Sequence, residues 1–419
     1  MKSRMESTLD QQEIKSRYLT KSLVFGNPVS QIIDLGMHPF ADTFISHDQL
    51  SFAEPVFPLS CTLDEVSGLI HNEYLTPDVW RYNLYDYSYT SSNSAFSRNH
   101  WSDFAKFIKE LLASDSQKIV EVGSNDGFLC LQLKELGFDI LGVDSASAMC
   151  KIANDSGIET IEASFSSDSA YEIKEKKGSY DCLIANNVLN HANDPLDFIN
   201  GVDILLNPKG YFVFEVPYWL DLVDSGHFDQ IYHEHVSYFT VFSLKNLLSL
   251  AGFCILNVSR VDYHGGSLRI VAVRFSDYQE GENSEVETMI ALEKSKRLFN
   301  KDSYSSFRRR IQSERSRIMT IIHDHITKTP DVPIVGVGAA AKANTFLNYY
   351  GLNSSYLLAV TDSSPLKQGK YTPLTRIPIV SDEIFANFTE VSALILSWNL
   401  SDKLKTVLLG LNPKIRFLL

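Results

Sequence analysis

The alternation of apolar runs with helix-length segments is the clearest pattern in this chain. Between residues 96 and 275, four short apolar runs (KIVEVG, FDILGVD, YDCLIANNV and GYFVFEVP) are each separated by a segment long enough for a helix. Buried parallel strands are continuous apolar runs, and crossover helices connect them. The pattern therefore predicts an α/β domain over residues 96–275 with a doubly wound, mostly parallel Rossmann-like sheet.

Two further regions flank this domain. Residues 1–95 contain short β-rich segments, such as Gln31–Leu35 and Val56–Leu59, separated by Pro, Gly and Asp. They predict a small β-rich N-terminal domain. Residues 276–419 begin with a charged stretch, typical of an amphipathic helical connector with a solvated face. From Pro333 a second strand-helix series follows, which predicts a C-terminal Rossmann-like α/β domain.

Composition narrows the possible functions. The chain has 419 residues, 44% hydrophobic and 21% charged, which excludes a disordered or fibrous protein. Its formal net charge of −13 disfavours nucleic-acid partners. No apolar run approaches the roughly 20 residues of a membrane span, and the N-terminus has no signal core, so we expect a cytoplasmic protein without membrane partners. The five cysteines form no C-x-x-C pair, so we expect no disulfide framework and no cysteine zinc site.

The first strand of the middle domain ends in a turn suited to a cofactor. This strand runs into Glu121-Val-Gly-Ser-Asn-Asp-Gly127, and the second strand ends at Asp144. Glycines let the backbone approach a ligand, and an acidic residue after the second strand suits the hydroxyls of a ribose. A dinucleotide site and an ordinary turn are the alternatives, but the turn lacks G-x-G-x-x-G. It therefore favours S-adenosylmethionine, with ligands Glu121, Gly123, Asn125, Gly127 and Asp144.

Further residues at the same edge complete this prediction. Phe165 follows the third strand, where it can cover an adenine face or simply fill the core. Asn186 and Asn187 end the fourth strand, and open α/β sheets bind ligands at that edge. We expect all three to contact the cofactor.

A cluster of titratable residues follows the fifth strand. The cluster reads Tyr232-His233-Glu234-His235. Burying several titratable groups costs free energy, so such a cluster indicates a functional site. A histidine can accept a proton near neutral pH, and Glu234 can orient it or stabilise its charge. The H-E-H sequence also resembles a metal-ligand fragment, but no further ligand stands at helical spacing, so we predict no metal. A structural polar patch is the other alternative.

These motifs, taken together, closely resemble those of the nucleotide-sugar C-methyltransferases. The resemblance covers nearly the whole chain and includes a C-terminal domain that ordinary methyltransferases lack. The motifs that carry it are EVGSNDG, ANNVLNH, YHEHVSYFT, HGGSLR, GVGAAAKANTFLNY, TDSSPLKQGKYTPLTRIPI and LSWN.

The resemblance implies a three-domain enzyme of branched-deoxysugar synthesis that uses S-adenosylmethionine. It implies that His235 is the general base, with Tyr232 and Glu234 beside it, and that His191 faces the sugar. A tyrosine of the Y-x-Y-x-S-S segment, Tyr87 or Tyr89, is implied to close over the site. The C-terminal domain is implied to hold the nucleotide diphosphate of a small-molecule nucleotide-sugar substrate. The matching residues there are Lys342 and Asn344, and relatives of this type imply a monomer or weak dimer.

One departure from the family concerns its zinc-binding N-terminal domain. The family has two C-x-x-C pairs there. This chain has Asp64 and Ser67 at one pair and the region of Lys21 at the other, with Cys61 out of register. Zinc needs thiolate ligands in such sites. We therefore predict no zinc, with this domain held by its own packing.

The predicted reaction is methyl transfer to carbon, at C-3 of a nucleotide-linked 4-keto-deoxysugar. A sugar carbon becomes nucleophilic beside a ketone, once His235 removes the α-proton and a donor stabilises the enolate. A sugar O-methyltransferase using the same base is the nearest alternative. An NAD-dependent sugar oxidoreductase is disfavoured by the absence of G-x-G-x-x-G, and a non-catalytic nucleotide-sugar binding protein by the intact motifs.

Overall fold

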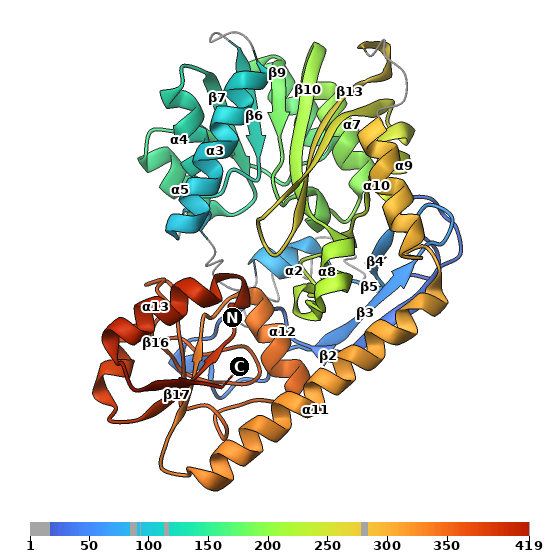
Figure 1. Ribbon diagram of the computed structural model, residues 1–419. Helices are drawn as coiled ribbons and strands as arrows, with labels where there is room; N and C mark the ends of the chain where they lie inside the picture. Colours follow the sequence, from blue (N-terminus) through green and yellow to red (C-terminus); the bar gives the residue numbers. More distant parts are fainter. Residues whose placement is uncertain (1–16, 84–89, 93, 113–116, 278–283, 419) are drawn as a thin grey trace.

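The computed structural model describes residues 17–83, 90–92, 94–112, 117–277 and 284–418, and the structural statements below concern these residues. A β-rich N-terminal lobe lies beside two α/β domains, one in the middle of the chain and one at its C-terminal end (Figure 1). Within the described ranges, no helix has the length and apolar character needed to cross a membrane. No group of three or more His, Cys, Asp or Glu side chains in these ranges could hold a metal ion.

The middle domain is built on a seven-stranded sheet of order β12-β13-β10-β9-β6-β7-β8. The four apolar runs of the sequence form four of its parallel strands, as predicted, and a fifth parallel strand is added at one edge. Strand β13 pairs antiparallel to β10, and β12 in turn pairs antiparallel to β13. The strands are β6 (Lys118–Val122), β7 (Asp139–Asp144), β8 (Thr160–Glu162), β9 (Tyr180–Ile184), β10 (Leu206–Pro217), β12 (Phe253–Val261) and β13 (Ser267–Arg274).

Helices cover both faces of this sheet because neighbouring strand residues point to opposite sides. Ile119 packs with α3 and α4, whereas Val120 packs with the cluster that contains α6, α7 and α9. Both faces of β6 are therefore buried, which explains its continuous apolar sequence. The helices are α3 (Ala95–Leu111), α4 (Phe128–Glu135), α5 (Ser147–Asp155), α6 (Ser167–Lys177), α7 (Pro195–Leu205), α8 (Trp219–Ser225) and α9 (Val241–Leu250), with short 3₁₀ turns η2 (Leu189–His191), η3 (Phe228–Gln230) and η4 (Phe275–Asp277).

The N-terminal lobe shares its main sheet with the middle domain. This sheet is antiparallel and has the order β11-β4-β3-β2, with β2 (Ser30–His38), β3 (Phe57–Leu63), β4 (Ile70–Asn72) and β11 (Ser237–Tyr238). Strand β11 follows directly after residues 232–235 and pairs with β4. The lobe therefore holds the end of that segment by backbone hydrogen bonds. Its remaining elements are β1 (Arg17–Tyr18), β5 (Tyr74–Leu75), α2 (Asp78–Asn83) and η1 (His47–Gln49).

Two helices connect the middle domain to the C-terminal domain. They are α10 (Ser284–Ser295) and α11 (Tyr304–Lys328), separated by η5 (Lys301–Ser303). Helix α11 buries one apolar face and runs beside β2, where Arg308 donates a hydrogen bond to the carbonyl oxygen of Ile32 at 2.8 Å (Figure 1). The predicted connector is thus helical, and part of it packs against the lobe.

The C-terminal domain has a five-stranded parallel sheet of order β16-β15-β14-β17-β18. Its order reverses direction between β14 and β17, which is where open α/β sheets form a ligand crevice. The elements are β14 (Ile334–Val337), α12 (Ala341–Tyr350), β15 (Ala359–Thr361), β16 (Ile379–Val380), η6 (Asp382–Asn387), β17 (Val391–Ile395), η7 (Trp398–Leu400), α13 (Ser401–Leu411) and β18 (Ile415–Phe417).

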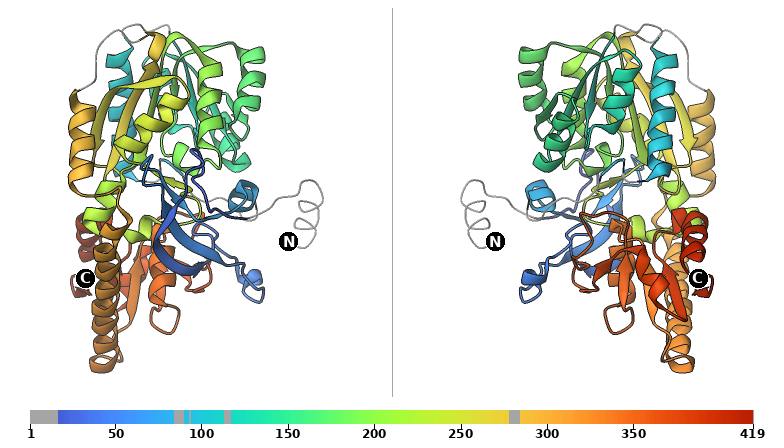
Figure 2. Two further views of the ribbon diagram at one scale, coloured as in Figure 1. Left: turned by 90° about the vertical axis from the view of Figure 1, so that its right-hand side faces the viewer. Right: turned by 90° about the vertical axis from the view of Figure 1, so that its left-hand side faces the viewer.

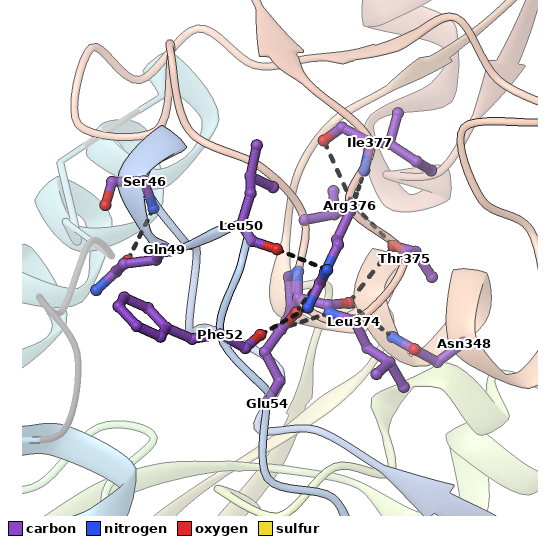
Figure 3. A network of polar contacts seen from close by, with 12 residues as sticks. Ser46, Gln49, Leu50, Phe52, Glu54, Asn348, Leu374, Thr375, Arg376 and Ile377 are labelled. Carbon is purple, nitrogen blue, oxygen red and sulfur yellow. Dashed lines mark hydrogen bonds and ion pairs between the residues drawn. The ribbon is translucent and has the colours of Figure 1, made fainter. Parts of the chain in front are cut away.

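The lobe also contacts the C-terminal domain directly, as the side views show (Figure 2). Ile45 and Tyr371 form an isolated antiparallel bridge. Nearby, the Glu54 carboxylate accepts hydrogen bonds from the backbone N–H of Leu374 at 2.7 Å and from Nε of Arg376 at 3.2 Å (Figure 3). All three regions of the chain are thus in contact.

Candidate active site

A cavity of about 350 Å³ opens at the carboxyl ends of β6, β7 and β9, and we call it the cofactor cavity. Seven of the residues predicted to bind the cofactor line it: Glu121, Gly123, Asn125, Asp144, Phe165, Asn186 and Asn187. Gly127 does not line it. This glycine begins α4 with φ +78°, and a Cβ there would lie 2.9 Å from the Cβ of Ala153, so its role is to pack α4 against α5.

Glu121 is a buried carboxyl group at the floor of this cavity. The Cys130 thiol donates a hydrogen bond to it at 2.9 Å. Burial, together with the nearby carboxylates of Asp126 and Asp144, raises the pKa of Glu121 to about 8. The group is therefore mostly protonated at neutral pH in the free protein.

Asp144 is held by the backbone of the neighbouring loops. It accepts hydrogen bonds from the N–H of Asn125 and of Ala146, each at 2.8 Å. Burial raises the pKa of Asp144, and these two bonds oppose that shift. Gly123 has φ +72°, and a Cβ there would lie 2.2 Å from Val188, so only glycine fits the turn.

Several polar atoms in the cofactor cavity find no hydrogen-bond partner among the described residues. They are buried, and they are the Oγ of Ser124, the Nδ2 of Asn186 and the Oδ1 of Asn187. Buried polar groups are normally satisfied in native proteins. Their gathering in one cavity therefore indicates a ligand with both donors and acceptors.

Two serines near the N-terminal lobe also reach this site, and the sequence analysis did not single them out. Ser91 donates its backbone N–H to Oδ1 of Asn125 at 2.8 Å and its hydroxyl to Asp126 at 2.5 Å. Ser92 donates its hydroxyl to the other oxygen of Asp126 at 2.5 Å. The Y-x-Y-x-S-S motif is a sequence signal for these contacts, because its serines follow the predicted tyrosines. Tyr87 and Tyr89 themselves lie outside the described residues.

A second cavity of about 500 Å³ lies between the middle and C-terminal domains, and we call it the acceptor cavity. Asn187 and His191 line both cavities, which therefore meet at these two side chains. Tyr232, Glu234 and His235 line the acceptor cavity. The structure thus brings together the residues predicted to act as base and donors, beside the predicted cofactor ligands.

His235 is oriented by a backbone carbonyl. Its Nδ1 lies 3.0 Å from the carbonyl oxygen of Gln230, and its Nε2 lies 2.6 Å from the hydroxyl of Tyr232. A carbonyl oxygen only accepts, so Nδ1 carries the proton and Nε2 accepts from Tyr232. Burial lowers the pKa of His235 to about 3, so the ring is neutral in the free protein. The Gln230 carbonyl, rather than Glu234 as the sequence suggests, therefore orients the His235 ring.

Glu234 bonds to the N-terminal lobe instead. Its Oε1 accepts from the backbone N–H of Ala41 at 3.1 Å and of Asp42 at 3.2 Å. Its Oε2 is buried and finds no hydrogen-bond partner among the described residues. Burial raises the pKa of Glu234 to about 7.

The backbone of the same segment is also bonded to the lobe. Asn72 donates to the carbonyl oxygen of Tyr232 at 3.3 Å, and the ring of His233 donates to that of Pro58 at 3.1 Å. Arg81 donates to the carbonyl oxygen of His233 at 3.2 Å and to Asn193 at 2.8 Å. Each of residues 232–234 is therefore fixed from the lobe.

His191 lies at the boundary between the cavities. Its ring centroid is 5.1 Å from that of His235, with the rings nearly perpendicular. Burial lowers the pKa of His191 well below its ordinary value, and the neighbouring His235 adds to the shift. Both rings are therefore neutral at physiological pH.

The C-terminal wall of the acceptor cavity includes the start of α12. Lys342 is the second residue of this helix and lines the cavity. Gly338 precedes the helix with φ +93°, and a Cβ there would lie 2.0 Å from the Ser397 hydroxyl. Asn344 points elsewhere: its Nδ2 donates to the carbonyl oxygen of Ala41 at 2.6 Å, and it is not part of the cavity lining.

Comparison with known proteins finds methyltransferases similar to both α/β domains. A family model described as a methyltransferase domain matches residues 96–258, and one described as a C-methyltransferase C-terminal domain matches residues 262–409. The chain is 30% identical over 370 residues to the C-methyltransferase NovU of Streptomyces niveus, which covers 88% of this chain and 87% of that protein. It is 28% identical over 112 residues to a ubiquinone biosynthesis O-methyltransferase of Bordetella avium, which covers 26% of this chain and 46% of that enzyme.

Solved structures are similar to one part of the chain. The PH0226 protein of Pyrococcus horikoshii has a TM-score of 0.37 and 16% identity, covering 44% of this chain and 94% of that one. Magnesium protoporphyrin IX methyltransferase of Synechocystis, with bound S-adenosylhomocysteine, has a TM-score of 0.34 and 15% identity, covering 42% of this chain and 82% of that one.

Proposed function

Because the chain belongs to the C-methyltransferase family, we propose that it methylates C-3 of a nucleotide-linked 4-keto-deoxysugar, with His235 as the base. The chain is an S-adenosylmethionine-dependent methyltransferase. One observation carries the finer proposal: the cofactor cavity and the acceptor cavity meet at Asn187 and His191, and His235 lines the acceptor side. A methyl donor in one cavity and a carbon acid in the other would meet at that point.

The residues of the cofactor cavity fit S-adenosylmethionine. Asp144 and Glu121 offer oxygens to ribose hydroxyls, and Phe165 offers a ring to an adenine face. Ser124, Asn186 and Asn187 offer the unpartnered polar atoms that an amino acid group can satisfy. When bound, the cofactor supplies an electrophilic methyl group on a positively charged sulfur.

His235 accepts the proton that must leave the sugar. A carbon beside a ketone becomes a nucleophile when its α-proton is removed, and the neutral Nε2 of His235 can take that proton. The Tyr232 hydroxyl now donates to the same Nε2. That hydroxyl must first turn away from Nε2, which frees the nitrogen lone pair for the α-proton. The turned hydroxyl can then donate to the ketone oxygen, where the enolate charge develops.

The C-terminal wall supplies groups for the nucleotide diphosphate. The N-terminus of α12 and the Lys342 ammonium both line the acceptor cavity. Backbone N–H groups at a helix start and a lysine beside them favour an anion. Asn344 bonds to the lobe, so we assign it the task of fixing α12 against Ala41 rather than of contacting the substrate.

A methyl-transfer assay tests the proposal. The protein and S-adenosylmethionine are incubated with dTDP-, GDP- and CDP-linked 4-keto-deoxysugars, and the products are analysed by mass and carbon NMR. A new methyl on C-3 supports the proposal, and a methoxy signal would replace it with O-methylation. His235→Ala should lower kcat at least about a hundredfold while S-adenosylhomocysteine still binds, since general bases contribute about 10² to 10⁴ in rate. Near-normal turnover by that variant would refute the base assignment.

A further inference from the structure

The Trp398 side chain contacts Lys342 in the wall of the acceptor cavity and also contacts the middle domain. The ammonium nitrogen of Lys342 lies 4.4 Å from the centroid of the Trp398 ring, within the range of a cation–π contact. The same nitrogen donates to the side-chain oxygen of Asn399, the next residue. The turn η7 after β17 therefore fixes where the Lys342 charge lies.

The rest of the indole is enclosed by the middle domain. Its Nε1–H donates to Oδ2 of Asp229 at 2.7 Å, and its ring stacks on that of His227 with centroids 3.4 Å apart. A Cβ at Gly265, which has φ +86°, would lie 2.3 Å from the indole. Glycine at this position lets the H-G-G loop close against Trp398.

Asp229 is one residue from the group that orients the base. Asp229 and Gln230 form the turn η3, and the Gln230 carbonyl accepts the Nδ1 proton of His235. From α12, the Thr345 hydroxyl donates to the carbonyl oxygen of Ile231 at 3.1 Å. The C-terminal domain thus holds both sides of Gln230, through Trp398 on one side and Thr345 on the other.

We propose that Trp398 is a positioning residue that couples the Lys342 ammonium to His235. Its ring face places the charge that meets the nucleotide diphosphate, and its N–H fixes the Asp229–Gln230 turn that orients the base. This inference rests on the proposed function in one respect, the diphosphate contact of Lys342. A substrate held at Lys342 would then be aligned with a base whose orientation depends on the same side chain.

Two substitutions separate the two roles. Trp398→Phe keeps a ring under Lys342 but loses the N–H, so kcat should fall about tenfold, as misplaced catalytic groups commonly cost. The affinity for dTDP, GDP and CDP, measured by calorimetry, should stay within about twofold, because the cation–π contact remains. Trp398→Leu should lower kcat in the same way and weaken nucleoside diphosphate binding at least about fivefold.

Trp219→Phe is the matched control. Its indole N–H donates to the Tyr304 hydroxyl at 2.8 Å, it is buried, and it lines neither cavity. This variant should lose stability but keep kcat, KM and affinity for S-adenosylhomocysteine. If Trp398→Phe changed only stability, as this control does, the positioning role would be overturned.

Asp229 provides an independent pair of variants. Asp229→Asn keeps an acceptor for the indole and should retain kcat within about threefold, whereas Asp229→Ala should match Trp398→Phe. Equal kcat in the two Asp229 variants would overturn the inference. Lys342→Gln separates it from the proposed function: if that variant binds all three nucleoside diphosphates normally, the diphosphate contact fails and with it the ring-face role of Trp398.

Discussion

Ionisation of the Glu121 carboxyl group should be coupled to cofactor binding. Its pKa of about 8 means that the free protein carries a protonated carboxyl group there at neutral pH. Ribose hydroxyls donate hydrogen bonds, which favour the ionised form. The affinity for S-adenosylhomocysteine should therefore rise with pH between about 6 and 8, by at most about tenfold per unit, and level off above about 8.

Glu121→Gln tests this linkage because it removes the titration and keeps the shape. Calorimetry between pH 6 and 9 should give a pH-independent, weaker affinity for this variant. Proton release on binding by the wild type should also disappear in the variant. If the affinity of the wild type for S-adenosylhomocysteine stayed constant between pH 6 and 9, the cofactor would not be bound by the ionised carboxylate of Glu121.

At the scale of elements, the segment of residues 232–235 is held in place by the N-terminal lobe. Asn72 on β4 donates to the Tyr232 carbonyl oxygen, and β11 extends the same sheet. Asn72→Ala should lower the free energy of unfolding by about 1–3 kcal/mol, because buried groups lose their partners. It should also lower kcat about threefold to tenfold through displacement of Tyr232. Calorimetric binding of S-adenosylhomocysteine should be unchanged.

Thr62→Val is the control for Asn72→Ala. Thr62 lies on β3, and its hydroxyl lies 3.4 Å from both Nδ1 and the carbonyl oxygen of His71, within the lobe. Thr62→Val should also lower the free energy of unfolding, but it should leave kcat unchanged. If both variants lowered kcat equally, the effect would come from loosening of the lobe and not from the hydrogen bond to Tyr232.

Asp64 joins two turns of the lobe, at a position where the family resemblance implies a cysteine pair. Its carboxylate accepts from the Ser67 hydroxyl at 2.5 Å, from the Val66 N–H at 3.0 Å and from the Asn27 amide at 3.1 Å. Burial alone would raise the pKa of Asp64, but these bonds outweigh it and hold the pKa below its ordinary value. The stabilisation is therefore present above the ordinary carboxyl pKa and is lost as pH falls through the lowered one.

Asp64→Ala should lower the free energy of unfolding by about 2–3 kcal/mol, the scale of hydrogen bonds to a charged group. The measurement is denaturant unfolding at pH 7, repeated at low pH, where the difference from wild type should shrink. Metal chelators should leave the Tm of the wild type unchanged. A fall in Tm on chelation would show that a metal, and not this carboxylate, joins the two turns.

At the scale of the whole molecule, the sequence predicts features that a few neighbouring residues determine, and it misses contacts between residues far apart in the chain. The strands β6, β7, β9 and β10 and the turn at Gly123 are visible because a few consecutive residues determine them. Strand β11 has only two residues and exists because β4 pairs with it. The bond between Trp398 and Asp229 joins residues far apart in the chain, although the L-S-W-N motif marks one end.

The same limit applies to side-chain direction. The family resemblance implies that Lys342 and Asn344, both in the first turn of one helix, are substrate ligands together. In the structure Lys342 lines the acceptor cavity, whereas Asn344 faces Ala41. Residues two apart on a helix point to different sides. Which side lines the site depends on where the lobe lies, and the helix sequence does not show that.

The contact between the lobe and the C-terminal domain provides a test at this scale. Arg376 donates to the carbonyl oxygens of Leu50 at 2.7 Å and Phe52 at 2.8 Å as well as to Glu54 (Figure 3). The Glu54 side chain is 5% exposed and that of Arg376 is 39% exposed. Solvent screening at the arginine should therefore limit the coupling of the pair in a double-mutant cycle to about 1 kcal/mol.

Weakening this contact should change the KM for the sugar nucleotide more than the free energy of unfolding. Asp42 of the lobe and Lys342 of the C-terminal domain line the same cavity, so a loosened contact widens the acceptor site. Arg376→Gln should raise KM for the sugar nucleotide about threefold to tenfold and leave the affinity for S-adenosylhomocysteine unchanged. Arg416→Gln removes the exposed pair with Glu390 within one domain and should change neither. If Arg376→Gln behaved like Arg416→Gln, the other contacts of the lobe, which include β11 and the backbone bridge at Tyr371, would be sufficient to hold it in place.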